Sequence, residues 1–153
     1  MITVQQAQPA DANALTDIAM IAKQHWGYDS QFMLACAEEL KQTAAMLQDE
    51  RRATWTAKVD ESLAGFFAIQ FDHEPSCELE ALFVLPQFMG LGVGQHLFGK
   101  AVTVAQSNGY QAMTIVSDPY ALNFYLKQGA QQQEMIASQS IPGRMLPLLQ
   151  LPL

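Results

Sequence analysis

The chain has 153 residues, half of them apolar and 15% charged, which is enough for a folded domain with its own core. The net charge of −7 argues against a nucleic-acid backbone as partner, because binding there needs a basic surface. No apolar run is long enough to span a bilayer, the first residues do not resemble a signal peptide, and two cysteines make neither a disulfide framework nor a metal-ligand spacing. We therefore expect a cytoplasmic protein with no metal and no membrane or nucleic-acid partner.

The first half of the chain predicts a strand, two helices and a hairpin. Alternating apolar and polar residues predict a strand at 1–7, and two helical segments follow, opened at Asp11 and at Asp29. The period then changes to two, which predicts an antiparallel hairpin with strands at 54–59 and 63–71.

The second half begins with a βαβ unit. A strand is predicted at 77–84, a helix at 92–108 and an apolar strand at 112–117. A helical crossover of this length implies that the two strands are parallel.

Three shorter elements complete the chain: a helix at 121–128 and strands at about 131–137 and 145–151. Pro147 and Pro152 suggest an edge position or a bulge for the last strand, because proline cannot donate to a sheet ladder. The predicted fold class is α/β (α+β), with helices on the faces of a mixed sheet.

Three glycines at alternate positions, Gly90, Gly92 and Gly94, lie where the predicted strand at 77–84 leads into the predicted helix at 92–108. Glycines allow backbone N–H groups to approach an anion, and the helix N-terminus adds a positive dipole, so this loop suits a phosphate. A Walker loop is excluded because Lys100 is followed by alanine and lies inside the helix. A dinucleotide loop is disfavoured because Gln95 stands where a small residue is required and little chain follows.

Two motifs and their order point to a family. Residues 87–92, QFMGLG, match the pattern Gln/Arg-x-x-Gly-x-Gly/Ala of the acetyl-CoA pyrophosphate loop, and residues 82–86, LFVLP, look like the strand that precedes it. Residues 118–130, DPYALNFYLKQGA, are similar to the segment Asn-Ala-x-x-Phe-Tyr-x-x-x-Gly-Phe/Ala. The chain thus resembles the GNAT superfamily of acetyl-CoA-dependent N-acetyltransferases over essentially its whole length.

This resemblance implies a fold and an activity. Residues 1–153 are expected to form a single N-acetyltransferase domain, with a mostly antiparallel sheet of six or seven strands, a parallel splayed pair and about four helices. The implied reaction moves an acetyl group from acetyl-CoA to a primary amine of a small molecule by direct transfer. A non-catalytic acyl-CoA sensor and a protein or peptide amine acetyltransferase remain alternatives, and many relatives pair as homodimers.

The resemblance also implies the cofactor site. Residues 82–84 would bind the pantetheine arm and the N–H groups of 89–95 the pyrophosphate. The sequence departs from the pattern at Met89, where a basic residue is usual, and at Tyr120, where Asn is usual. The predicted cofactor-binding residues are Leu82, Phe83, Val84, Gln87, Met89, Gly90, Leu91, Gly92, Val93, Gly94, Gln95, Asn123 and Tyr125.

Three residues are candidates for proton transfer. Glu78 and Glu80 are candidate bases, and strand alternation predicts that they share a face with Leu82 and Val84. They could instead be solvated carboxylates, or act through a water relay. Tyr125 matches the family tyrosine near the cofactor sulfur and is the candidate acid, although it could be a buried packing residue.

The acceptor site is predicted less directly. His25, Trp26 and Tyr28 lie between the first two helices, where aromatic rings could surround a cationic amine or simply pack at a helix end. Ser140 and Arg144 lie in a polar loop between the last strands. Arg144 could pair with a substrate carboxylate or phosphate, or be a surface charge.

Overall fold

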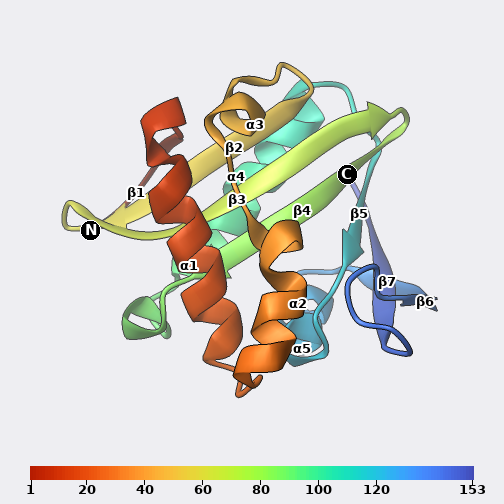
Figure 1. Ribbon diagram of the computed structural model, residues 1–153. Coiled ribbons are helices and arrows are strands. Elements are labelled where there is room, and N and C mark those ends of the chain that lie inside the picture. The colour runs from red at the N-terminus through yellow and green to blue at the C-terminus, as the bar shows by residue number, and fades with distance from the viewer.

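The computed structural model describes residues 1–153 with the exception of the side chain of His73. Its centre is one seven-stranded sheet in the order β1-β2-β3-β4-β5-β7-β6 (Figure 1). The β4–β5 pair is parallel, and all other neighbours are antiparallel. The strands are β1 (Ile2–Gln6), β2 (Arg52–Val59), β3 (Ser62–His73), β4 (Ser76–Val84), β5 (Ala112–Val116), β6 (Gln131–Ala137) and β7 (Met145–Pro152).

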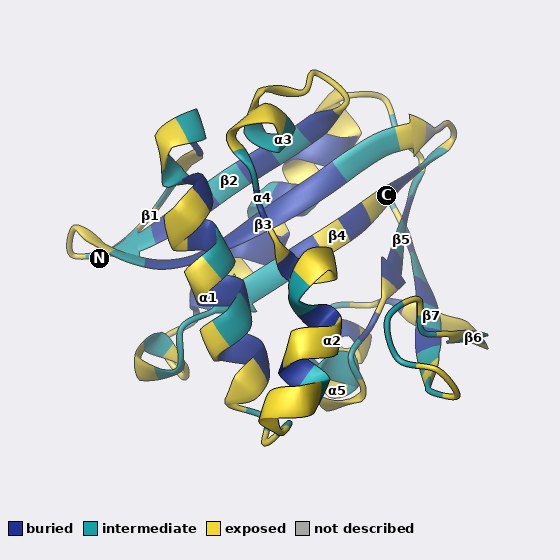
Figure 2. Ribbon diagram, in the orientation of Figure 1, coloured by how far each residue is buried: buried dark blue, intermediate teal, exposed yellow. Residues whose placement is uncertain are grey.

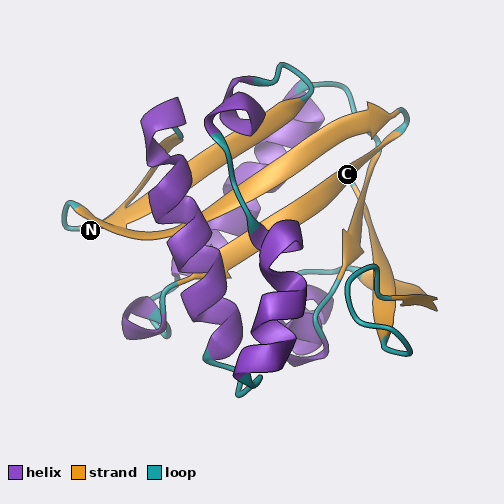
Figure 3. Ribbon diagram, viewed as in Figure 1, coloured by secondary structure: helices purple, strands orange, loops and turns teal.

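Helices cover both faces of this sheet (Figure 3). In that view α1 and α2 lie in front of the central strands and α4 lies behind them. Among the described helices, none is long and apolar enough to cross a membrane. The helices are α1 (Ala12–Gln24), α2 (Ser30–Leu40), α3 (Ala44–Gln48), α4 (Val93–Ser107) and α5 (Leu122–Lys127).

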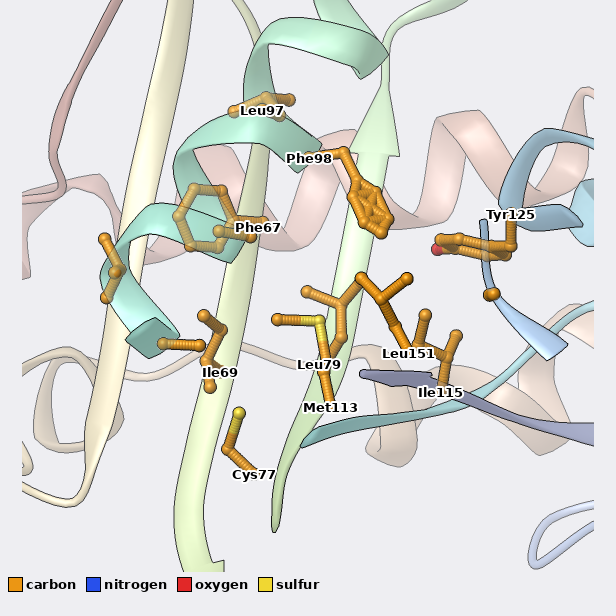
Figure 4. Close-up of a cluster of buried hydrophobic side chains, with 14 of the residues drawn as sticks. Phe67, Ile69, Cys77, Leu79, Leu97, Phe98, Met113, Ile115, Tyr125 and Leu151 are labelled. Atoms are coloured by element: carbon orange, nitrogen blue, oxygen red, sulfur yellow. The ribbon is translucent and has the colours of Figure 1, made fainter. Parts of the chain in front are cut away.

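The core has one cluster on each face of the sheet, and β3 contributes to both. Phe66 packs toward α1 and α2 with Leu15, whereas Phe67 packs toward α4 with Leu97. Both phenylalanines are fully buried, and Figure 2 shows β3 buried along its middle. Figure 4 shows the α4 cluster, which extends across β4 and β5 to Tyr125 of α5. A strand covered on both faces explains the nearly continuous apolar run in β3.

Strands β4 and β5 pair over only a short stretch and then separate. Three pairs connect them, from Ser76–Ala112 to Glu78–Thr114. Figure 1 shows the strands diverging beyond this point. The separation leaves one edge of β4, from Glu80 onward, without its parallel neighbour, and this opening positions the site described below.

Strand β4 carries a bulge at Glu80, since the residues on either side of it, Leu79 and Ala81, pair with consecutive residues of β3. The extra residue resets the alternation of side chains. Leu79 before it and Leu82 and Val84 after it all pack toward α4, while Ala81 packs on the α1–α2 side. The prediction that both glutamates of this strand share a face with Leu82 and Val84 is therefore wrong.

One other prediction is wrong, and one short helix was not predicted. Strand β7 is not at an edge, because it lies between β5 and β6, and β6 forms the edge. Pro152 ends β7, and the carbonyl of Pro147 accepts the N–H of Ser117 at 2.9 Å. The predicted bulge is not in β7 either: the register shift between β6 and β7 lies in β6, between Gln132 and Glu134. Helix α3 was not predicted, because five residues are too few to display a helical period, although Thr43 caps it by accepting the Met46 N–H.

Candidate functional site

Two cavities meet where β4 and β5 separate. One, of about 420 Å³, lies toward α1 and α2; we call it the polar cavity, and its lining includes Arg52, Glu78, Glu80 and Asp118. The other, of about 680 Å³, lies toward α4 and α5 and includes Gly90, Gly92 and Gly94; we call it the glycine-loop cavity. The residues that line both are Trp26, Leu82, Phe83, Ala121 and Tyr125.

The glycine loop has the backbone geometry that an anion site needs. Gly90 and Gly92 have φ angles of +82° and +88°, in the left-handed region that favours glycine. The first hydrogen bond of α4 runs from the His96 N–H to the Gly92 carbonyl, at 3.1 Å. The N–H groups before it have no partner within the helix and, with the helix dipole, make this end of the cavity attractive to a phosphate.

Most of the predicted cofactor residues line the glycine-loop cavity. The exceptions are Gln87, Leu91 and Asn123, which are exposed outside its lining. Lys127, one helical turn after Asn123, does line the cavity and was missed by the sequence analysis. Its ammonium is a cation at this site, where Met89 provides none.

Tyr125 lies at the junction of the two cavities and is only 7% exposed. Its ring packs against Phe98 and Phe124, with centroid distances of 5.9 and 5.3 Å. Figure 4 shows its hydroxyl directed away from α5, toward the cluster around Leu79. Burial raises the pKa of Tyr125, and the negative charge of Asp118 raises it further, so the phenol keeps its proton at neutral pH.

Glu80 is held by a buried arginine. The Arg52 side chain is 4% exposed and donates from Nη1 to Glu80 Oε2 and from Nη2 to Gln42 Oε1, the latter at 2.6 Å. Burial lowers the pKa of Arg52, and the carboxylate of Glu80 opposes that shift. Glu80 thus presents a fixed carboxylate to the polar cavity, which Glu78 also lines.

A second charged group, the Asp118 cluster, consists of Lys23, Tyr28, Asp118 and Arg144. The Asp118 side chain is 8% exposed, and its Oδ2 accepts from Lys23 Nζ at 3.2 Å, from the Tyr28 hydroxyl at 3.0 Å and from Arg144 Nη2 at 3.3 Å. The Tyr28 hydroxyl also accepts from Arg144 Nη2 at 2.5 Å. Burial raises the pKa of Tyr28, and Asp118 adds to that shift while Arg144 opposes it. Tyr28 therefore remains a donor to Asp118.

The predicted acceptor residues are only partly brought together. Trp26 lines both cavities, and Arg144 lines the polar cavity with a side chain that is 17% exposed, so the surface-charge alternative is wrong for Arg144. Tyr28 belongs to the Asp118 cluster and does not line either cavity. His25 is exposed at the end of α1. Ser140 lies outside the cavity lining, but it donates at 2.8 Å to Glu39 of α2, which lines the polar cavity.

Sequence reasoning missed Lys23, Arg52 and Asp118 as parts of the site. Lys23 had a usable signal, because it follows Ala19 by four residues on the otherwise apolar stripe of α1. Arg52 lies on the same face of β2 as Thr54 and Thr56. Polar residues at alternate positions are typical of an exposed face, but all three are buried. Asp118 precedes a proline as a helix-capping residue would, and only the fold shows its other partners.

Comparison with known proteins gives one family. The family model of the acetyltransferase (GNAT) family matches residues 15–130, about three-quarters of the chain. No curated protein sequence matches significantly.

Solved structures of similar fold agree over nearly the full chain. PaiA N-acetyltransferase from Thermoplasma acidophilum, in complex with coenzyme A, is 14% identical with a TM-score of 0.80, over 100% of this chain and 99% of that one. A GCN5-related N-acetyltransferase from Rhodopseudomonas palustris is 21% identical with a TM-score of 0.80, over 99% and 95%. The ribosomal-protein-S18-alanine N-acetyltransferase from Escherichia coli is 19% identical with a TM-score of 0.73, over 99% and 94%.

Proposed function

Because the chain belongs to the acetyltransferase (GNAT) family, we propose that it moves an acetyl group from acetyl-CoA to a primary amine of a small molecule by direct transfer. The main support is the junction of the two cavities at Leu82, Phe83 and Tyr125. Direct transfer requires both substrates to reach one point from separate sites. The polar cavity, at about 420 Å³, suits a small acceptor.

We also propose that the protein is cytoplasmic. Its two cysteines, Cys36 and Cys77, are buried and free, which is consistent with a reducing compartment.

The residues of the glycine-loop cavity fit acetyl-CoA. Left-handed Gly90 and Gly92 and the free N–H groups of α4 suit a pyrophosphate, and Lys127 adds a cation. The unpaired edge of β4 at 82–84 offers backbone groups to a pantetheine arm. When bound, acetyl-CoA supplies the thioester whose carbonyl carbon forms a bond to the amine nitrogen as its bond to sulfur breaks.

Gly94 gives a direct test of the cofactor site. A Cβ there would lie 3.4 Å from the Phe124 ring, so the Gly94→Val variant should fill the space between α4 and α5. We expect the Kd for CoA, measured by calorimetry, to rise by about tenfold or more. Gly99→Val is the matched control, since it lies in the same helix with nothing within 4 Å of its Cβ. Equal CoA affinity in the two variants would contradict this placement.

The amine and the departing sulfur need opposite proton transfers. An alkylamine with a pKa of roughly 10.4 is mostly protonated at neutral pH and must lose a proton before it attacks. Arg52 engages Oε2 of Glu80, which leaves Oε1 to accept that proton directly or through water. Tyr125, kept protonated by burial, can donate its hydroxyl proton to the sulfur as the thiolate forms.

The Glu80→Gln variant should therefore lower kcat/KM by about 10²-fold at pH 7. The loss should shrink as the pH rises through the amine pKa of roughly 10.4, above which most of the amine is neutral without help. Glu38→Gln, on the exposed side of α2, is the control and should match the wild type. A loss that stays constant across the pH range would indicate that Glu80 only supports Arg52, and Glu78→Gln would then be the next variant to profile.

The overall proposal is tested by following the release of free CoA thiol over a broad panel of small amines and peptides. Transfer to small amines is the expected result. Acetyl-CoA binding without transfer to any acceptor would support the sensor alternative, and transfer to peptides alone would support the peptide alternative.

A further inference from the structure

The polar cavity is lined by charged side chains of both signs. The Asp118 cluster places two cations, Lys23 and Arg144, on a single carboxylate. Tyr28 is neutral, so this cluster has an excess of one positive charge. Three carboxylates outside this cluster also line the cavity: Glu78 and Glu80 of strand β4, the latter paired with Arg52, and Glu39 of α2, which accepts from Ser140.

Arg144 still has donors to offer within this cavity. Both of its side-chain hydrogen bonds, to Asp118 and to the Tyr28 hydroxyl, use Nη2. Its Nε and Nη1 groups have no partner among the described residues, while the side chain lines the cavity. The loop that carries Arg144 is closed by its own backbone bonds: the Ser138 N–H donates to the Arg144 carbonyl at 2.8 Å, and the Arg144 N–H donates to the Ile141 carbonyl at 3.2 Å. A positioned guanidinium with an unused edge is suited to a carboxylate.

We propose that the acceptor is an amino acid or an amino-carboxylate of similar size, with its carboxylate bound by Arg144 beside Lys23 and its amine facing the glutamates of β4. The inference rests on the proposed acetyl transfer and adds the chemical class of the acceptor. A diamine fits less well, because it has no carboxylate for the free edge of Arg144 and its second ammonium group would lie beside Lys23 and Arg144. The negative net charge of the whole chain does not oppose this, since short-range partners outweigh distant surface charge at physiological salt.

The first test compares matched acceptors on the wild-type protein. Each amino acid is assayed beside its carboxamide and its decarboxylated amine, and kcat/KM is measured from free CoA thiol release. We expect the free acids to exceed both analogues by about tenfold or more, because the analogues leave the Nε and Nη1 groups of Arg144 without an acceptor. The amine of an amino acid amide is the weaker base and has the larger neutral fraction, so a preference for the acid would reflect recognition of the carboxylate.

The second test uses Arg144 itself. Arg144→Gln should lower kcat/KM for the acid by about tenfold or more while changing that for the amide by less than about threefold, so that the discrimination is lost. Arg144→Lys keeps the charge without the planar fork and should retain part of it. Arg51→Gln removes an equal charge from an exposed side chain outside the cavities and should leave the discrimination unchanged.

The outcomes separate this inference from the function on which it rests. Acetylation of amides and simple amines as fast as the acids would overturn the amino-carboxylate acceptor while leaving acetyl transfer in place. Failure to acetylate any amine while CoA binds would overturn both. If Arg144→Gln does not fold, as judged by its thermal unfolding, the wild-type comparison and Arg144→Lys still decide the question.

Discussion

The Tyr125→Phe variant should lower kcat by about 10²-fold or more while the Kd for CoA changes by less than about threefold. The two side chains have nearly the same shape, and the ring of Tyr125 packs against Phe98 and Phe124, so the variant should fold normally. What it loses is the proton that a buried phenol holds at the junction of the two cavities. Single-turnover measurement of thiol release, beside calorimetric CoA titration, checks both parts.

Tyr110→Phe provides the control for this substitution. Tyr110 stacks on Phe71 at a centroid distance of 5.1 Å and lines neither cavity, so its variant should keep the wild-type rate. A Tyr125→Phe protein with unchanged kcat would rule out the phenol as the acid. That result would also imply that the thiolate takes its proton from solvent.

The Asp118→Ala variant should lose about 3–5 kcal/mol of unfolding free energy. Asp118 is the shared partner of Lys23 and Arg144, whose side chains are both largely buried. Its removal leaves two cations close together without a counter-charge and removes the acceptor for the Tyr28 hydroxyl. Denaturant unfolding followed by circular dichroism measures the loss, and Asp118→Asn should lose less because its amide oxygen still accepts hydrogen bonds.

Asp60→Ala is the matched control for the Asp118 variant. The Asp60 side chain is 79% exposed, and it pairs with the amino group of Met1 at 2.8 Å. An exposed pair of this kind contributes at most about 1 kcal/mol. Equal free energies of unfolding for Asp118→Ala and Asp60→Ala would show that the buried ion pairs of Asp118 do not stabilise the fold more than an exposed pair does.

The features that follow from local sequence were the predictable ones. Asp29 opens α2 as expected, with its side chain accepting the Phe32 N–H at 2.8 Å. The glycine loop was also predictable, because positive φ angles at Gly90 and Gly92 are a property of glycine itself. The fold class and the parallel β4–β5 pair followed from the order of these elements.

The features that depend on pairing across the fold were not predictable. The bulge at Glu80 exists only in the register between β4 and β3, and it moves both glutamates away from the expected face. The Asp118 cluster joins Lys23 to Asp118 across 95 positions and Tyr28 to Arg144 across 116 positions of the sequence. No spacing rule relates residues so far apart, so their roles depend on tertiary structure.

The short ladder between β4 and β5 has a mechanical consequence. It joins two halves of the sheet, β1–β4 and β5–β7, through three residue pairs at one end, like a hinge. The Asp118 cluster crosses the open end, since Lys23 and Tyr28 belong to the first half of the chain and Asp118 and Arg144 to the second. The spacing between β4 and β5 at this end therefore depends on the ion pairs of Asp118 with Lys23 and Arg144, and not on backbone hydrogen bonds between the strands. A ligand that binds the guanidinium of Arg144 would therefore contact a residue whose hydrogen bonds to Asp118 and Tyr28 connect the two halves of the sheet.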